Sequence, residues 1–101
     1  MSFELAFVES ALKEWRKLGH TIRGQLKRKL AERLVQPHVP ADRLHGLPNC
    51  YKIKLRAAGY RLVYEVDDHI VTVTVIAVGR RDKGLVYSEA LERRHERGEK
   101  P

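Results

Sequence analysis

The stretch YKIKLRAAGYRLVYEV, from Tyr51 to Val66, decides how the whole sequence is interpreted. Two runs of alternating apolar and polar residues flank a short Ala-Ala-Gly segment, which is the pattern of a β-hairpin. Successive side chains of a strand point to opposite faces, so the first strand places its apolar residues on one face and its cations on the other. These cations are Lys52, Lys54 and Arg56.

The pairing of the two strands determines what these cations face. If Arg56 lies opposite Arg61 around a four-residue loop, the apolar side chains of both strands share one face, which is what normally fixes the register. Arg61 then joins the other cations on the polar face, and like charges oppose one another. Such an arrangement costs stability unless an anion lies between the charges. The hairpin is therefore predicted to bind an anion.

The segment GRRDKGLVY, which follows the last predicted strand, supplies further candidates: Arg80, Arg81, Lys83 and Tyr87. If that strand lies beside the hairpin, Arg81 and Tyr87 reach the same polar face. Such a group could hold a phosphate and stabilise the extra charge of a phosphorane-like transition state. The predicted catalytic set is Lys52, Lys54, Arg61, Arg81 and Tyr87. From spacing alone, a solvated basic face or simple binding of a phosphate backbone is the more frequent explanation.

The N-terminal part is predicted to form a short strand and two helices. Ser10 and Thr21 are candidate N-caps of these helices, and Gly19 is the candidate end of the first. In the second helix, leucines recur every four residues until Pro37 ends the pattern. The first strand is expected at 3–8, the helices at 10–19 and 21–35, and a loop at 36–49.

The C-terminal part adds strands at 51–56, 60–67 and 70–79, then a short helix at 87–94. The strand at 70–79 is apolar on both faces apart from its threonines, which predicts a central position in the sheet. The whole chain, residues 1–101, is predicted to be one α+β domain, with a frayed tail at about 95–101.

The two helices are strongly basic on their polar faces. Residues 13–33 contain eight basic residues against Glu14 and Glu32, which accounts for most of the formal net charge of +7. For any single residue a solvated helix face is the better explanation, but the cluster predicts a surface that attracts nucleic-acid phosphates. The basic residues are Lys13, Arg16, Lys17, Arg23, Lys27, Arg28, Lys29 and Arg33.

The bulk properties favour a cytoplasmic protein with an anionic partner. The sequence pI is about 9.9. We expect no transmembrane helix, because no apolar run is long enough, and no signal peptide, because the first residues lack a basic region. Cys50, the single cysteine, is expected to be a small core residue in a reducing compartment.

Several separate segments of the sequence resemble the RelE toxins of the RelE/ParE superfamily: ALKEWRKLG, YKIKLR, GYRLVYEV, VGRRDK and VYSEA. The resemblance runs from about Phe3 to about Arg94. It implies a microbial-RNase-like fold, with the two N-terminal helices packed on a four-stranded, mainly antiparallel sheet. It also implies a ribosome-dependent mRNA interferase that cuts mRNA in the ribosomal A site. The ribose 2′-hydroxyl attacks the adjacent phosphate, leaving a 2′,3′-cyclic phosphate, without a metal or other cofactor.

The resemblance assigns the catalytic roles to the predicted set. RelE toxins lack the Glu and His pair of ordinary ribonucleases of this fold, and no histidine of this sequence lies on the hairpin strands. We expect Lys54 to act as the base, with its pKa lowered by neighbouring cations. Lys52 and Arg61 would stabilise the transition state, and Arg81 would assist the leaving group, chiefly electrostatically. Tyr87 would stack on or orient the nucleotide.

The resemblance also implies partners. A RelB-like antitoxin would wrap the toxin and cover or displace the helix around Tyr87, and operator DNA would be bound only through that antitoxin. The ribosome would be contacted through its rRNA and the A-site mRNA. The helical cations and a second group are the expected RNA-contacting residues; the second group is His45, Arg56, Arg80 and Lys83. His45 stands where the family carries a basic residue. A neutral imidazole would weaken a backbone contact there, and the interpretation as an ordinary loop histidine is slightly favoured.

Two alternatives remain open at this point. The first is a ParE-like toxin of the same superfamily, directed at DNA gyrase and without ribonuclease activity; ParE-type chains generally lack the full catalytic set named above. The second is a non-catalytic RNA-binding or co-repressor module, which would bind ribosomes or DNA without cutting mRNA.

Overall fold

The computed structural model describes residues 2–81, 85–96 and 98 of the chain. Its elements follow the predicted order, with a short 3-10 helix added in the loop. They are β1 (Glu4–Phe7), α1 (Glu9–Arg16), α2 (His20–Val35), the 3-10 helix η1 (Pro40–Asp42), β2 (Cys50–Leu55), β3 (Tyr60–Asp67), β4 (Thr72–Arg80) and α3 (Leu85–Arg93).

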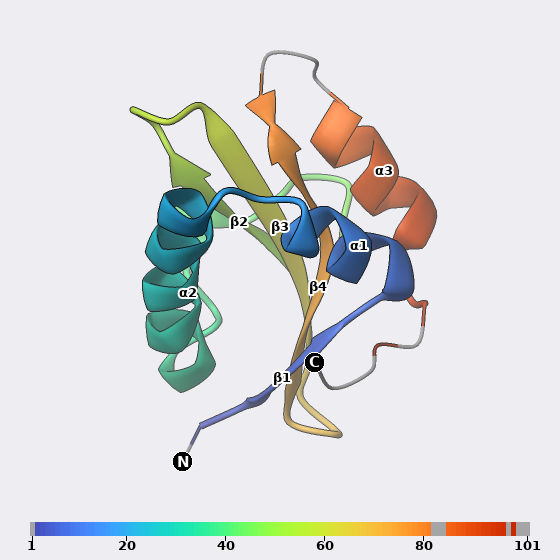
Figure 1. Cartoon of the computed structure of the whole chain (residues 1–101). Helices are drawn as coiled ribbons and strands as arrows, with labels where there is room; N and C mark the ends of the chain where they lie inside the picture. Colours follow the sequence, from blue (N-terminus) through green and yellow to red (C-terminus); the bar gives the residue numbers. More distant parts are fainter. Residues whose placement is uncertain (1, 82–84, 97, 99–101) are drawn as a thin grey trace.

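The four strands form one mixed sheet in the order β1-β4-β3-β2. β1 pairs with β4 in parallel, and the β4-β3 and β3-β2 pairs are antiparallel. The mainly antiparallel α+β fold and the interior position of β4 are therefore confirmed. α2 and α3 lie on opposite sides of the sheet, and α1 lies next to α3 (Figure 1). None of the described helices is long and apolar enough to cross a membrane.

The two faces of the sheet have different neighbours. On the α2 side, Leu26 and Leu30 of the helix and Ile53 and Leu62 of the hairpin are almost fully buried in one core. This core is the main source of stability, since each buried aliphatic side chain contributes about 1.5–3 kcal/mol. The opposite face of the hairpin carries the cations, so the sheet separates the apolar core from the basic surface.

Small residues let α3 approach the sheet closely. A Cβ added at Gly79 would lie 3.4 Å from a methyl carbon of Val86 in α3. Ala77 and Ala90 are fully buried nearby in the same core cluster. Because Gly79 pairs with Arg61 across the β3-β4 ladder, this close approach sets α3 beside the basic face of the hairpin.

The hairpin register differs from the prediction. Arg61 lies opposite Lys54, not Arg56, and Leu55 pairs with Tyr60. The turn is closed by the Gly59 N–H, which donates to the Leu55 carbonyl at 2.8 Å, and Gly59 has φ of +72°. A shift of two residues leaves every side chain on its predicted face, so the apolar pattern could not distinguish the two registers.

The predicted helix caps are also wrong. Val8 is the N-cap of α1 and Gly19 is the N-cap of α2, and neither makes a side-chain capping bond. Val8 is fully buried, and its N–H donates to the Val75 carbonyl while its own carbonyl accepts from Leu12. The chain thus passes directly from strand to helix, and tertiary burial fixes this boundary in place of a cap.

Part of the expected frayed tail is described and lies against the sheet. The backbone N–H of His95 donates to the Glu65 carboxylate at 3.0 Å, and the His95 ring lies 3.1 Å from the other carboxylate oxygen. Gly98 lies so close to Thr74 that an added Cβ would clash with it. These contacts continue the attachment of α3 to the sheet beyond its last turn.

Arg93 anchors α3 to the rest of the fold. Its guanidinium donates to both carboxylate oxygens of Glu14 in α1, at 2.8 and 3.1 Å, and to Glu89 at 2.6 Å. It also donates at 3.1 Å to the carbonyl of Ile76, where the β3-β4 register shifts. The Arg93 side chain is only 14% exposed. One side chain therefore joins α1, α3 and the irregular point of β4.

We predict that Arg93→Met destabilises the protein and loosens α3. The substitution leaves the carboxylate of Glu14 without its main partner, which should lower the free energy of unfolding by about 2 kcal/mol. Urea unfolding measures this change, and amide hydrogen exchange in α3 should become faster. Arg43→Met, which removes an exposed loop cation, is the control. An unchanged unfolding midpoint for Arg93→Met would contradict the anchoring role.

Candidate active site

Three members of the predicted catalytic set lie together on the hairpin. Lys52 and Lys54 lie on β2 and Arg61 lies on β3, with Lys54 directly opposite Arg61. All three are half-buried, whereas the alternate residues Ile53 and Leu62 are buried on the other face. The alternation of a β-strand therefore produces the cluster, and the like-charge opposition expected from the sequence is present.

Tyr87 reaches this cluster from α3. The guanidinium carbon of Arg61 lies 5.2 Å from the centroid of the Tyr87 ring, which is the geometry of a cation–π contact. Within the described structure, the Nε atom of Arg61 and the hydroxyl of Tyr87 are enclosed without a hydrogen-bond partner. Enclosed polar groups are nearly always paired, so these two atoms gain partners only where a side-chain movement opens them to a ligand or to water.

Arg81, the last member of the predicted set, lines a small hollow together with Lys54 and Arg61. The Arg81 N–H donates to the Gly59 carbonyl at 2.8 Å, which holds the end of β4 against the hairpin turn. The hollow has a volume of about 150 Å³, and a water molecule occupies about 30 Å³, so a phosphate-sized group fits. Four of its six lining residues are cations; the lining consists of Lys54, Leu55, Arg56, Tyr60, Arg61 and Arg81. Leu55 and Tyr60 are the two lining residues that were not among the predicted site residues.

The cluster alters the acidity of its central lysine. The pKa of Lys54 lies below its ordinary value, chiefly because of the charge of Lys52, then because of partial desolvation and the charges of Arg61 and Arg56. Neighbouring cations disfavour the protonated form. Lys54 is therefore the group in this cluster best suited to accept a proton.

The remaining hairpin and loop candidates differ in their position relative to the small hollow. Arg56 is exposed and lines the hollow, and the guanidinium carbon of Arg80 lies 5.9 Å from the Tyr60 ring centroid. His45 is exposed in the loop before β2 and does not line this hollow. Lys83 lies outside the described residues.

Most of the helical cations are exposed. Lys13 is 3.6 Å from Glu9, and Arg23, which is half-buried, donates to the Arg16 carbonyl at 3.4 Å. The fully exposed members are Lys13, Arg16, Lys17, Lys27, Arg28 and Lys29.

Arg33 is not among these exposed cations, so its assignment to RNA binding is corrected. Its side chain is 15% exposed and lies 2.6 Å from the Asp42 carboxylate. The same guanidinium donates to the Tyr64 hydroxyl at 2.9 Å and to the Lys52 carbonyl at 3.2 Å. Arg33 therefore ties α2 and η1 to the hairpin backbone that carries Lys52. A basic residue near a helix end gave no indication of this role, because its partners are distant in sequence.

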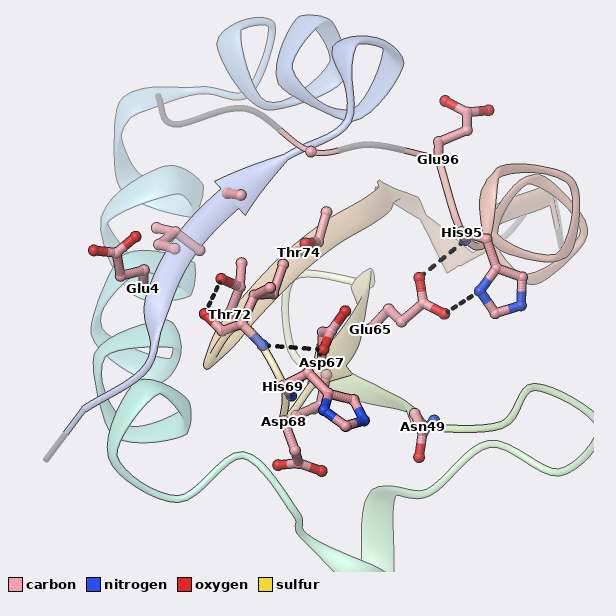
Figure 2. A pocket seen from close by; sticks show the side chains of 15 residues that line it. Glu4, Asn49, Glu65, Asp67, Asp68, His69, Thr72, Thr74, His95 and Glu96 are labelled. Carbon is pink, nitrogen blue, oxygen red and sulfur yellow. Dashed lines mark hydrogen bonds and ion pairs between the residues drawn. The ribbon is translucent and has the colours of Figure 1, made fainter.

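A larger hollow at the other end of the sheet is unsuited to RNA. It has a volume of about 720 Å³, and its lining residues include five acidic residues, Glu4, Glu65, Asp67, Asp68 and Glu96 (Figure 2). These charges repel phosphate. Among the described residues, no group of three or more His, Cys, Asp or Glu side chains is placed to hold a metal ion.

Cys50 is a core residue, as expected. It is fully buried, and burial raises the pKa of its thiol to about 12, with a further contribution from Glu65. A thiol that stays protonated is not a nucleophile at neutral pH. The reactive groups on the basic face of the hairpin are therefore the lysine amines, the guanidinium groups and the phenol of Tyr87.

Comparison with known proteins places this geometry in a family. The model of the ParE toxin of the type II toxin-antitoxin system parDE matches residues 5–84. The mRNA interferase toxin RelE of Escherichia coli K12 is 59% identical over 93 residues, which cover 92% of this chain and 98% of that protein. The chain belongs to the RelE/ParE toxin family. The mRNA interferase RelE of Shigella flexneri is similar to the same extent.

Solved structures of the RelE toxin agree with this assignment. A variant of Escherichia coli RelE in the free state superposes with a TM-score of 0.86 at 57% identity, covering 93% of this chain and 99% of that chain. RelE in the intact Escherichia coli RelBE toxin-antitoxin complex superposes with a TM-score of 0.78 at 58% identity, covering 80% of this chain and 99% of that chain. The RelE-like fold predicted from the sequence is confirmed.

We predict that Lys52→Met raises the pKa of Lys54 toward its ordinary value. The charge of Lys52 is the largest cause of the lowered pKa, and its removal stabilises the protonated ammonium. The protonated fraction of Lys54 at a given alkaline pH should therefore rise. NMR titration of the lysine side chains measures this, and Arg43→Met should leave the Lys54 titration unchanged. An unaltered Lys54 titration in Lys52→Met would contradict the electrostatic coupling.

Proposed function

We propose that this chain is the toxin of a type II toxin-antitoxin system and a metal-independent endoribonuclease that cuts mRNA in the ribosomal A site, inhibiting translation. The observation that carries the proposal is the cation cluster around the unpartnered Nε of Arg61 and hydroxyl of Tyr87. The similarity to proteins named mRNA interferase RelE supports it. The proposed reaction is a transesterification at a phosphodiester, and these groups match what that reaction needs.

The proposed reaction needs a base, charge stabilisation and an acid. The neutral amine of Lys54 removes the proton of the ribose 2′-hydroxyl, whose oxygen forms a bond to the adjacent phosphorus. The bond from phosphorus to the 5′-oxygen of the next nucleotide breaks, and that oxygen takes up a proton from a water molecule, while Lys54 later returns its proton to the solvent. The products are a 2′,3′-cyclic phosphate and a free 5′-hydroxyl, with no net oxidation or reduction.

The other residues of the set act on charge and geometry. Lys52 and the guanidinium group of Arg61 donate to the phosphoryl oxygens as negative charge accumulates on them. Arg81 stabilises the departing 5′-oxygen electrostatically, because a guanidinium does not lose its proton near neutral pH. The ring of Tyr87 stacks on the nucleotide and brings the 2′-hydroxyl into line with the leaving oxygen.

The shape of the site supports dependence on the ribosome. The hollow of about 150 Å³ accommodates a phosphate but does not enclose a nucleobase. Alignment of the attacking and leaving oxygens must therefore come from an external support, which the A site supplies to a bound codon. The exposed cations of α1 and α2 provide a surface for docking on rRNA.

The partner of this toxin is proposed to be a RelB-like antitoxin. Solved structures show Escherichia coli RelE in complex with its antitoxin RelB. An acidic segment that folds on binding suits the basic surface of this chain. We expect it to cover or displace α3, and so to remove Tyr87 from Arg61. Operator DNA would be bound only through the antitoxin, with the toxin as co-repressor in the cytoplasm.

A ParE-like gyrase poison is the second candidate, favoured by the description of the matching family model. It predicts inhibition of gyrase-catalysed supercoiling and intact mRNA on ribosomes. The cluster of Lys52, Lys54 and Arg61 beneath Tyr87 favours the ribonuclease, because binding gyrase requires no lysine with a lowered pKa.

We predict that Arg81→Ala lowers the rate of mRNA cleavage on ribosomes by at least about a hundredfold, the usual effect of removing a transition-state donor. Ribosome binding should remain measurable, because the other basic surfaces are intact. Single-turnover cleavage on ribosomes with an empty A site measures the rate, and Arg43→Ala should cleave like the unsubstituted protein. Full activity of Arg81→Ala would refute the assigned role.

A further inference from the structure

A second hollow adjoins the proposed active site on the side of α2. Its volume is about 370 Å³. It is lined by Gln25 and Lys29 of α2, by Lys54, Leu55 and Arg56, and by Ala57 and Ala58 of the hairpin turn. The small hollow of the active site is also lined by Lys54, Leu55 and Arg56. The two hollows are therefore neighbours that meet at the end of β2.

The second hollow has the chemistry of a phosphate site. Lys29 and Arg56 supply two positive charges, and Gln25 and the amine of Lys54 supply further hydrogen-bond donors. All of its lining residues are either cationic, neutral polar or apolar, so nothing in the described lining repels an anion. Ala57 and Ala58 lack long side chains, which leaves the backbone of the turn open to a ligand.

The position of β2 gives RNA a path between the hollows. β2 is the edge strand of the sheet in the described part of the chain, and the turn that follows it is partly exposed. A strand of RNA can pass from the basic face over this edge to α2 without crossing another strand. Lys54 lies at the crossing point, since its side chain lines both hollows.

We propose that the second hollow is a flanking-phosphate site, which binds the RNA phosphodiester next to the one that is cut. Lys29 and Gln25 hold this phosphate, and Arg56 lies between it and the scissile phosphate. The inference rests on the proposed function for the identity of the neighbouring phosphate. It gives Lys29 a role distinct from general docking on rRNA, because Lys29 would position the substrate strand itself.

The proposed role of Lys29 in binding can be separated from catalysis, because Lys29 is not among the causes of the lowered pKa of Lys54. The cations that lower the pKa of Lys54 are Lys52, Arg61 and Arg56. Removal of Lys29 should therefore weaken RNA binding while the base keeps its acidity. In a cleavage assay, Lys29→Gln should raise KM and leave kcat nearly unchanged, and Lys29→Arg should restore KM.

The direct test measures RNA binding by the protein alone. The probes are a dinucleotide with one phosphodiester and a trinucleotide with two, both 2′-O-methylated so that no cleavage can occur. NMR titration at low salt should show tighter binding of the trinucleotide, with amide shifts at Gln25, Ala57 and Ala58. In Lys29→Gln the trinucleotide should bind about three- to tenfold more weakly, and its salt slope should fall by about 0.7. Dinucleotide binding should hardly change.

Arg43→Gln is the matched control, since it removes one positive charge from an exposed residue outside both hollows. An equal loss of trinucleotide binding in Arg43→Gln and Lys29→Gln would overturn the site, as would equal affinity of the unsubstituted protein for the two probes. Failure of the unsubstituted protein to cut mRNA on ribosomes would instead refute the proposed function. The two failures are distinguishable because the binding test involves neither ribosomes nor cleavage.

Discussion

The opposition of Lys54 and Arg61 across the hairpin is the interaction on which the proposed active site depends. Two cations in direct cross-strand register destabilise a sheet, and here Lys52 adds a third charge nearby. The apolar side of the same strands offsets this cost, because Ile53 and Leu62 are buried against α2. In the hairpin, repulsion between cations on one face is therefore offset by the burial of apolar side chains on the other face. A bound phosphate relieves the repulsion, which makes the site selective for an anion.

The C-terminal helix converts this charged face into a site with a defined geometry. Close packing at Gly79 and the anchor of Arg93 on Glu14 hold α3 at one distance from the sheet. That distance places Tyr87 over Arg61 and leaves the Nε of Arg61 and the hydroxyl of Tyr87 without partners. Any partner that moves α3 therefore disassembles the site without touching the lysines. The antitoxin proposed above, which covers or displaces this helix, would inhibit the toxin in this way.

The sequence was most informative where side-chain alternation and helical periodicity act locally. They predicted the order of the elements, the polar face of the hairpin and the candidate residues of the site, and the family resemblance added the four-stranded sheet and the catalytic roles. The hairpin register was wrong because a shift of two residues preserves every face. Arg33 was misassigned because its partner Tyr64 is 31 residues away, and the Arg93 anchor was missed because Glu14 is 79 residues away. Contacts between residues so far apart leave no signal in the neighbouring sequence, whereas the alternation of a strand can be recognised from a few consecutive residues.

The central claim is that these cations cut a phosphodiester only when the ribosome holds it in line. The measurement that tests it most directly is primer extension on one mRNA, incubated with purified toxin in the presence and in the absence of translating ribosomes. The account predicts cuts within A-site codons in the first sample and none in the second. Cuts in naked RNA would contradict the dependence on external alignment, and intact mRNA in both samples would contradict the ribonuclease activity itself.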